Sequence, residues 1–92
     1  MKNLKATSDD VAAWMLAEVT RYRTLNQDDA VGQIDLKFGS HFTYENERGN
    51  SAISKTVLAA FNKITGDSVV WERAARLWRF REKHDYPGRM QP

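Results

Sequence analysis

Apolar residues recur every three or four positions in the first part of the chain, which is the spacing of one face of an α-helix. Thr7 or Ser8 can cap such a helix, and Asp9 and Asp10 follow in its first turn, where the helix dipole favours carboxylates. The pattern predicts a helix over about residues 8–22. Its inward stripe comprises Val11, Trp14, Met15, Val19 and Tyr22.

A second, shorter helix is predicted over about residues 27–38. Asn26 is a favourable N-cap residue, and Asp28 and Asp29 again place carboxylates in the first turn. Gly39 suits the left-handed position that often ends a helix. The residues expected to face inward are Val31, Ile34 and Phe38.

The pattern changes after Gly39. In the segment HFTYE, apolar and polar residues alternate, which predicts a brief strand over residues 41–45. The following NERGN is rich in turn residues, and Asn46 and Asn50 are expected to bond the local backbone. The overlapping ENERGN contains two carboxylates, Glu45 and Glu47, but it lacks the regular ligand spacing of a calcium loop.

A third helix is predicted to begin at Asn50 or Ser51 and to close at Gly66. Its inward face comprises Ile53, Val57, Phe61 and Ile64. No acidic residue occurs between Arg48 and Gly66. The outward face therefore carries small, polar and basic residues alone, namely Ser51, Lys55, Ala59, Asn62 and Lys63.

The segment 69–89, VVWERAARLWRFREKHDYPGR, fits two structures. A helix aligns Val70, Ala74, Leu77, Trp78 and Arg81, and ERAARL has high helix propensity. A hairpin turning at Ala74-Ala75 instead places Trp71 opposite Trp78 and gathers the large aromatic residues in one cross-strand cluster. Ala-Ala is a poor pair for a two-residue hairpin turn, so periodicity leaves both structures open.

Length and composition predict one small globular domain. The chain has 92 residues, of which 41% are hydrophobic and 28% charged. We expect an ordered core over about residues 8–86 and a loosely held tail over residues 87–92. Without cysteine, the chain has no disulfide, thiolate metal site or cysteine nucleophile. No signal peptide or membrane span is evident, so a cytoplasmic location without a membrane partner is expected.

The small net charge of +2 conceals an asymmetry. Residues 1–47 carry five basic and eight acidic side chains, whereas residues 48–92 carry nine basic and four acidic ones. If the two halves present different surfaces, the second half favours a polyanionic partner.

No catalytic, metal or cofactor site is predicted. The two histidines, His41 and His84, are far apart in sequence, and neither has a second ligand at a metal-binding spacing. The pair His84-Asp85 lacks an identifiable nucleophile, and DYPGR lacks a phosphate-binding glycine pattern. We expect no enzymatic activity, no cofactor and no small-molecule substrate.

Two long segments resemble a family of small uncharacterised bacterial proteins, some of them found in mobile integron gene cassettes. The segments are FGSHFTYENERGNSAISKTVLAAF and VVWERAARLWRFREKHDYPGR. The resemblance implies an α+β, winged-helix-like fold with three helices, a short strand and a C-terminal β-hairpin formed by the tryptophan segment. It implies no activity. The similar positions are Phe38, Gly39, Tyr44, Asn46, Gly49, Asn50, Ile53, Val57, Phe61, Val70, Trp71, Trp78, Arg79, Arg81, Asp85, Gly88 and Arg89.

On such a hairpin the tryptophans face the core, because a small domain needs their buried area, and the cations project outward. The first functional hypothesis is a DNA-binding module that contacts phosphates. One observation argues against it, because residues 39–50 form a longer connection than the turn of a helix-turn-helix. The candidate binding residues are Lys55, Asn62, Lys63, Arg73, Arg76, Arg79 and Arg81.

The alternative is a protein-interaction or homo-oligomerisation module that uses an exposed sheet edge or the C-terminal tail. A homodimer is one form of it. The two hypotheses differ in salt dependence, because the affinity of a phosphate-binding protein falls linearly with the logarithm of salt concentration.

Overall fold

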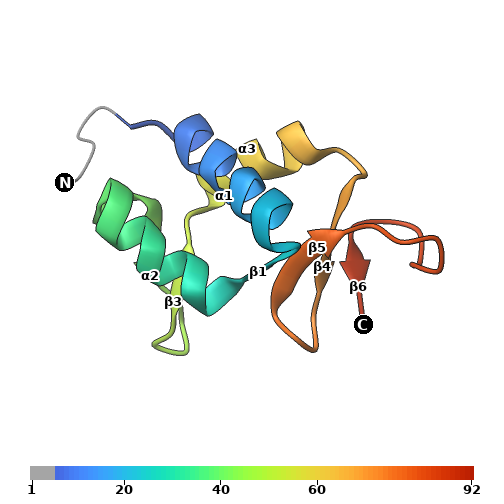
Figure 1. The fold of residues 1–92 in the computed structure, drawn as a ribbon. Helices are drawn as coiled ribbons and strands as arrows, with labels where there is room; N and C mark the ends of the chain where they lie inside the picture. The colour runs from blue at the N-terminus through green and yellow to red at the C-terminus, as the bar shows by residue number, and fades with distance from the viewer. Residues whose placement is uncertain (1–5) are drawn as a thin grey trace.

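A computed structural model describes residues 6–92 and has an α+β fold with three helices and two small sheets (Figure 1). Its elements, in chain order, are α1 (Ser8–Tyr22), β1 (Thr24–Asn26), α2 (Gln27–Phe38), the 3₁₀ turn η1 (Ser40–Phe42), β2 (Thr43–Glu45), β3 (Ser51–Ile53), α3 (Lys55–Thr65), β4 (Val69–Glu72), β5 (Leu77–Phe80) and β6 (Met90–Gln91).

The first two helices have the predicted boundaries, and their caps explain why. The Thr7 hydroxyl accepts a hydrogen bond from the Asp10 N–H at 3.3 Å, and the Asp10 carboxylate accepts one from the Thr7 N–H at 2.9 Å. This reciprocal pair is a capping box. At α2, the Asn26 side-chain oxygen accepts from the N–H groups of Asp28 and Asp29, and Gly39 ends the helix with φ of 95°.

The third helix begins later than predicted, because residues 51–53 form strand β3 instead of a first helical turn. The Asn46 side-chain oxygen accepts from the N–H groups of Arg48 and Asn50, both at 3.0 Å. Gly49 adopts φ of 80°. This local turn reverses the chain, so β3 pairs with β2 in an antiparallel hairpin and α3 begins only at Lys55.

The tryptophan segment is a hairpin, and its register is the one expected from the aromatic pairing. Trp71 lies opposite Trp78 and Val69 opposite Phe80, with the two indole centroids 4.6 Å apart. The turn spans residues 73–76, and its left-handed residue is Arg76, with φ of 55°. This turn is longer than two residues and has its positive φ at the last position, so Ala74 and Ala75 do not need the left-handed conformation.

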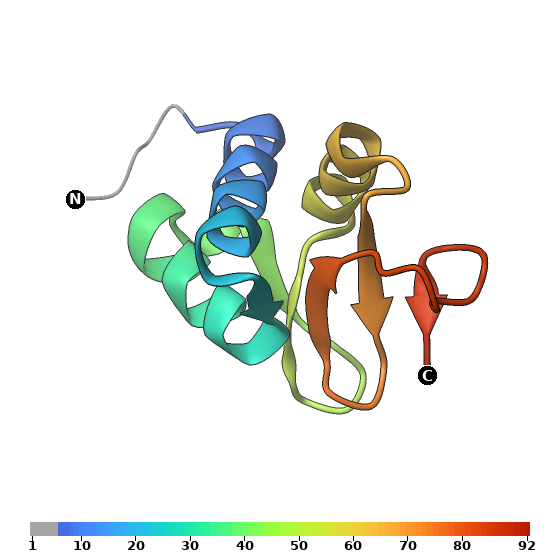
Figure 2. The ribbon, with the colours of Figure 1, turned by 45° about the vertical axis from the view of Figure 1, so that its right-hand side comes forward.

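The larger sheet has the strand order β1-β5-β4-β6. β1, which connects α1 to α2, runs antiparallel to β5, so the N-terminal part of the chain extends the C-terminal hairpin. This order of helices and strands is winged-helix-like, and the β2–β3 hairpin lies inside the connection between α2 and α3. Figure 2 shows β4, β5 and β6 side by side, with α3 above the hairpin.

The core forms where α1 packs against α3 and the hairpin. Phe61 of α3 is completely buried, and its ring meets Trp78 edge-on at a centroid distance of 5.7 Å. Two residues of the predicted inward stripes are exposed instead, Tyr22 at 59% and Ile64 at 46%, and Thr65 is buried at the end of α3.

The C-terminal residues are attached to the fold, whereas the sequence predicts a loosely held tail over residues 87–92. β6 pairs in parallel with β4, and Gln91 is 3% exposed. The Gln91 side chain accepts a hydrogen bond from the Tyr86 N–H and donates to the carbonyl groups of Tyr86 and Gly88. The segment thus covers the edge of β4 that the hairpin alone leaves unpaired.

Candidate nucleic-acid interface

The exposed face of α3 carries three of the predicted binding residues, Lys55, Asn62 and Lys63. Lys55 and Asn62 are seven residues apart, so they share one side of the helix, and Lys63 lies beside Asn62. No acidic residue belongs to the helix. However, Glu45 and Glu47 line the same shallow depression as Lys55, so their carboxylates offset part of the positive charge at that end of the helix.

The turn of the β4–β5 hairpin exposes two more predicted residues, Arg73 and Arg76. Arg76 lies 3.3 Å from Asp28 at the start of α2, and the two side chains are 48% and 70% exposed. An exposed ion pair of this kind contributes only about 0–1 kcal/mol. A phosphate can therefore displace Asp28 at little cost.

Arg79, in contrast, is engaged within the domain. Its Nε lies 2.7 Å from Glu72, and Nη1 and Nη2 each donate to an Asp85 carboxylate oxygen at 2.8 Å. These carboxylates raise the pKa of the Arg79 guanidinium above its ordinary value. The hydrogen bonds from Arg79 and from the Glu82 N–H lower the pKa of Asp85 well below its usual range. We refer to Arg79, Glu72 and Asp85 as the Arg79 cluster.

Arg81 is also engaged, in this case by backbone carbonyl groups. Its Nε donates to Asp67 at 2.7 Å, and the two terminal nitrogens donate to Tyr86 and Gly88. The expectation that Arg79 and Arg81 project outward as free phosphate contacts therefore needs correction. Both arginines fix the segment that follows β5.

Arg89 has a structural role that sequence reasoning does not assign. Its guanidinium donates to the carbonyl groups of Asn62 and Gly66 at the end of α3, and also to Val69. A cation at this position bonds the free carbonyl groups of the helix and offsets its dipole. Arg89 lies close to the C-terminus of α3 in space but far from it in sequence, so only the fold reveals this contact.

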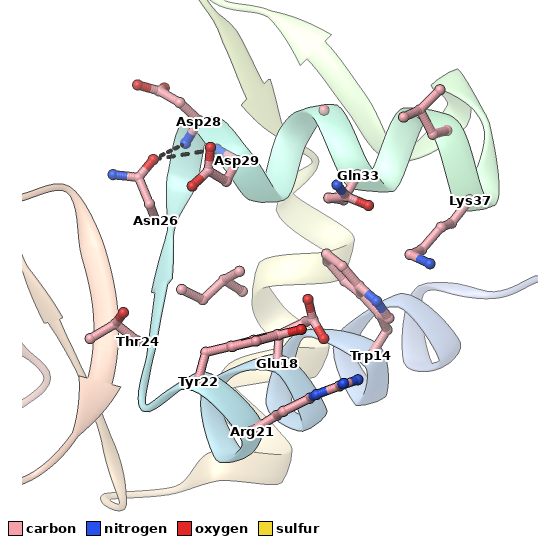
Figure 3. A pocket seen from close by; sticks show the side chains of 13 residues that line it. Trp14, Glu18, Arg21, Tyr22, Thr24, Asn26, Asp28, Asp29, Gln33 and Lys37 are labelled. Carbon is pink, nitrogen blue, oxygen red and sulfur yellow. Dashed lines mark hydrogen bonds between the residues drawn. The ribbon is translucent and has the colours of Figure 1, made fainter.

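A second surface feature lies between α1 and α2, where a groove of about 780 Å³ opens to solvent (Figure 3). Trp14 is half-buried there and meets Phe38 edge-on, with ring centroids 6.2 Å apart. Tyr22 and Leu36, which also line it, are 59% and 71% exposed. We refer to this feature as the α1–α2 groove.

Within residues 6–92, no three acidic or histidine side chains gather in a group suited to holding a metal ion. Over the same range, no helix combines the length and the apolar character needed to cross a membrane.

Residues 7–80 match the model of a family of unknown function, DUF6953. The chain belongs to this family. The matched DUF6953 region runs from the N-cap of α1 to the last residue of β5, so Glu72 and Arg79 lie inside it and Asp85 and Arg89 lie beyond it. Neither the search of curated proteins nor the search of solved structures found a match.

Proposed function

We propose that this domain binds nucleic acid through the exposed face of α3 and the turn of the β4–β5 hairpin. The observation that carries the proposal is the acid-free outer face of α3 within a winged-helix-like order of elements. The proposed contact residues are Lys55, Asn62, Lys63, Arg73 and Arg76. Arg79 and Arg81 are excluded from this set because their donors already have partners.

The chemistry of this set favours phosphate contacts over base recognition. Lysine is a compact point charge without the planar donor pair that recognises guanine, and the arginines lie in a turn away from the helix. Asn62 alone on α3 carries an amide that can contact a base edge. We therefore expect weak sequence preference and strong salt dependence.

The test is the binding of a generic DNA duplex, followed by fluorescence anisotropy at several salt concentrations. The affinity of the natural protein should fall linearly with the logarithm of salt concentration. Replacing Lys55 and Lys63 together by glutamine should reduce the slope by about two units. The single change at Lys63 should have the larger effect, because Lys55 lies beside two glutamates.

The matched control replaces Arg23 and Lys83 by glutamine. Both residues are exposed and lie in the turns after α1 and β5. Their replacement removes the same total charge as the replacement of Lys55 and Lys63. An equal loss of affinity in both double variants would show that net charge, rather than the α3 face, causes binding. If the natural protein shifts neither duplex nor single strand at low salt, the proposal is wrong.

A protein-interaction module is the second candidate, and the exposed Tyr22 and Leu36 of the α1–α2 groove favour it. An origin in bacterial integron cassettes and a cytoplasmic location stay predictions. A cassette origin is compatible with both the nucleic-acid-binding and the protein-interaction candidate.

A further inference from the structure

The α1–α2 groove contains a glycine that the packing of the monomer does not explain. Gly32 lies in the middle of α2, where glycine costs about 1 kcal/mol relative to alanine. A Cβ atom built on Gly32 would meet no heavy atom within 4 Å. The glycine is therefore not needed for contacts inside the domain. It leaves open space on the groove side of α2.

The groove also contains charged side chains of both signs that have no ion-pair partner among residues 6–92. They are Glu18, Arg21, Asp29 and Lys37. Figure 3 shows Asp29 and Lys37 toward opposite ends of α2, with the Trp14 and Tyr22 rings between the two helices. A purely basic partner would be repelled by Lys37 at one end of α2, and a purely acidic partner by Asp29 at the other end. A second copy of the chain, turned around, presents the opposite sign to each end.

We infer that two copies of this domain associate through their α1–α2 grooves, with the two α2 helices antiparallel across a two-fold axis. In this arrangement the exposed Leu36 of one copy enters the space above Gly32 of the other. The midpoint of Gly32 and Leu36 is Ile34, so the axis passes near this position.

The charged pair gives nearly the same axis. Asp29 and Lys37 have their midpoint at Gln33, one residue from Ile34, which is about 1.5 Å along the helix. One antiparallel crossing thus places Leu36 over Gly32 of the other copy and brings Lys37 within reach of Asp29 there. Both contacts occur twice, as in any isologous interface.

The size of the groove predicts weak association. Thirteen residues line it, fewer than the about 20–30 residues that each partner contributes to a standard interface. A micromolar dissociation constant is therefore expected. Sedimentation velocity should show a monomer of 10.6 kDa at low concentration and a growing share of dimer as the concentration rises through the micromolar range.

The decisive variant is Gly32→Gln, because it fills the groove while improving the helix propensity of α2. It should raise the midpoint of thermal unfolding of the dilute monomer and weaken dimerisation at least about tenfold, which corresponds to the loss of one strong interface contact. Leu36→Glu should also weaken the dimer, whereas the control Ile64→Glu, on α3, should not. Dimerisation that survives Gly32→Gln and Leu36→Glu would overturn the inference.

Charge reversal tests the orientation. Asp29→Lys alone and Lys37→Glu alone should each weaken the dimer several-fold through like-charge contacts, and the double variant should recover most of the loss. A double variant as weak as the worse single variant would contradict the antiparallel arrangement.

The absence of native cysteine allows a direct measurement of the axis. Gln33→Cys places the only thiol of each copy near the two-fold axis, so mild oxidation should give a covalent dimer in high yield. Lys63→Cys, on α3, is the control and should stay monomeric under the same conditions. A monomer at every concentration, or equal cross-linking of both variants, would refute the interface. Lys55 and Lys63 of α3 do not line the groove, so the duplex-binding test with these two lysines is independent of dimerisation.

Discussion

Arg79 shows how a basic residue in a strand can have its role decided by the opposite strand. Glu72 and Arg79 occupy the same face of the hairpin, and Val70 lies directly opposite Arg79. Diagonal neighbours of this kind are within reach of long side chains. The Glu72 contact therefore follows from the hairpin register. Asp85 does not, because it lies in an irregular segment whose path depends on Arg81 and Gln91.

Asp85→Asn should lower the midpoint of thermal unfolding at neutral pH, because it removes the charge that binds both terminal nitrogens of Arg79. The folded pKa of Asp85 is depressed, so the carboxylate stabilises the fold above its ordinary pKa of about 4. This stabilisation is lost as the pH falls through the depressed value. Thermal melts from pH 7 to strongly acidic pH should show the two proteins converging.

Asp28→Asn is the control for this prediction, because its ion pair with Arg76 is highly exposed. Its melt should differ little from that of the natural protein at any pH. Identical melts of Asp85→Asn and the natural protein at pH 7 would mean that the Arg79 cluster contributes nothing to stability.

At the level of elements, local signals predict those parts of the fold that local interactions decide. Asn26 with its following acids sets the start of α2, and Gly39 sets its end. The start of α3 is harder, because Ala52 and Ile53 are buried in a strand and would also suit the buried face of a helix. The pairing of β3 with β2 decides that residues 51–53 form a strand. The pattern of apolar residues within this segment carries no information on that pairing.

The hairpin depends on Trp78, which is 5% exposed and contacts both Trp71 and Phe61. Trp78→Ala should reduce the free energy of unfolding by about 3–5 kcal/mol, measured by urea denaturation. Such a loss would unfold much of a marginally stable domain. Ile64→Ala, at a residue 46% exposed, should cost far less. A loss below about 1 kcal/mol for Trp78→Ala would show that the aromatic pair is not part of the core.

For the molecule as a whole, periodicity predicts three helices and leaves residues 69–89 open between a helix and a hairpin. The resemblance to a known family implies the hairpin and the α+β fold that the structure has. The contacts of the basic residues depend on the full fold. Five of the seven candidate binding residues are exposed on α3 and the hairpin turn, and the other two, Arg79 and Arg81, are partly buried. The sequence predicts outward positions for the three residues on the helix by helical periodicity and for Arg79 and Arg81 by strand alternation, and it places Arg73 and Arg76 beside the hairpin tip. The C-terminal segment changes this outcome, because its Asp85 binds Arg79 and its Tyr86 and Gly88 carbonyl groups bind Arg81.

Removing residues 84–92 should therefore destabilise the whole domain. The truncated chain would lose Asp85 and β6 and would leave the edge of β4 unpaired. Thermal melts should show a lower midpoint, and light scattering should show aggregation through the free strand edge. A truncated chain that melts like the complete one and stays the same size would show that the segment is dispensable.

The pairing of β1 with β5 also has a consequence for biosynthesis. Thr24 pairs with Arg79, and 79 − 24 gives a separation of 55 residues. Contacts so distant in sequence slow folding, because a long loop must close before they form. During translation, β1 leaves the ribosome early and has no pairing partner until β5 has also emerged. Through that interval only the small β2–β3 sheet can form, and Leu25, the buried residue of β1, depends on the helices or on a chaperone for protection.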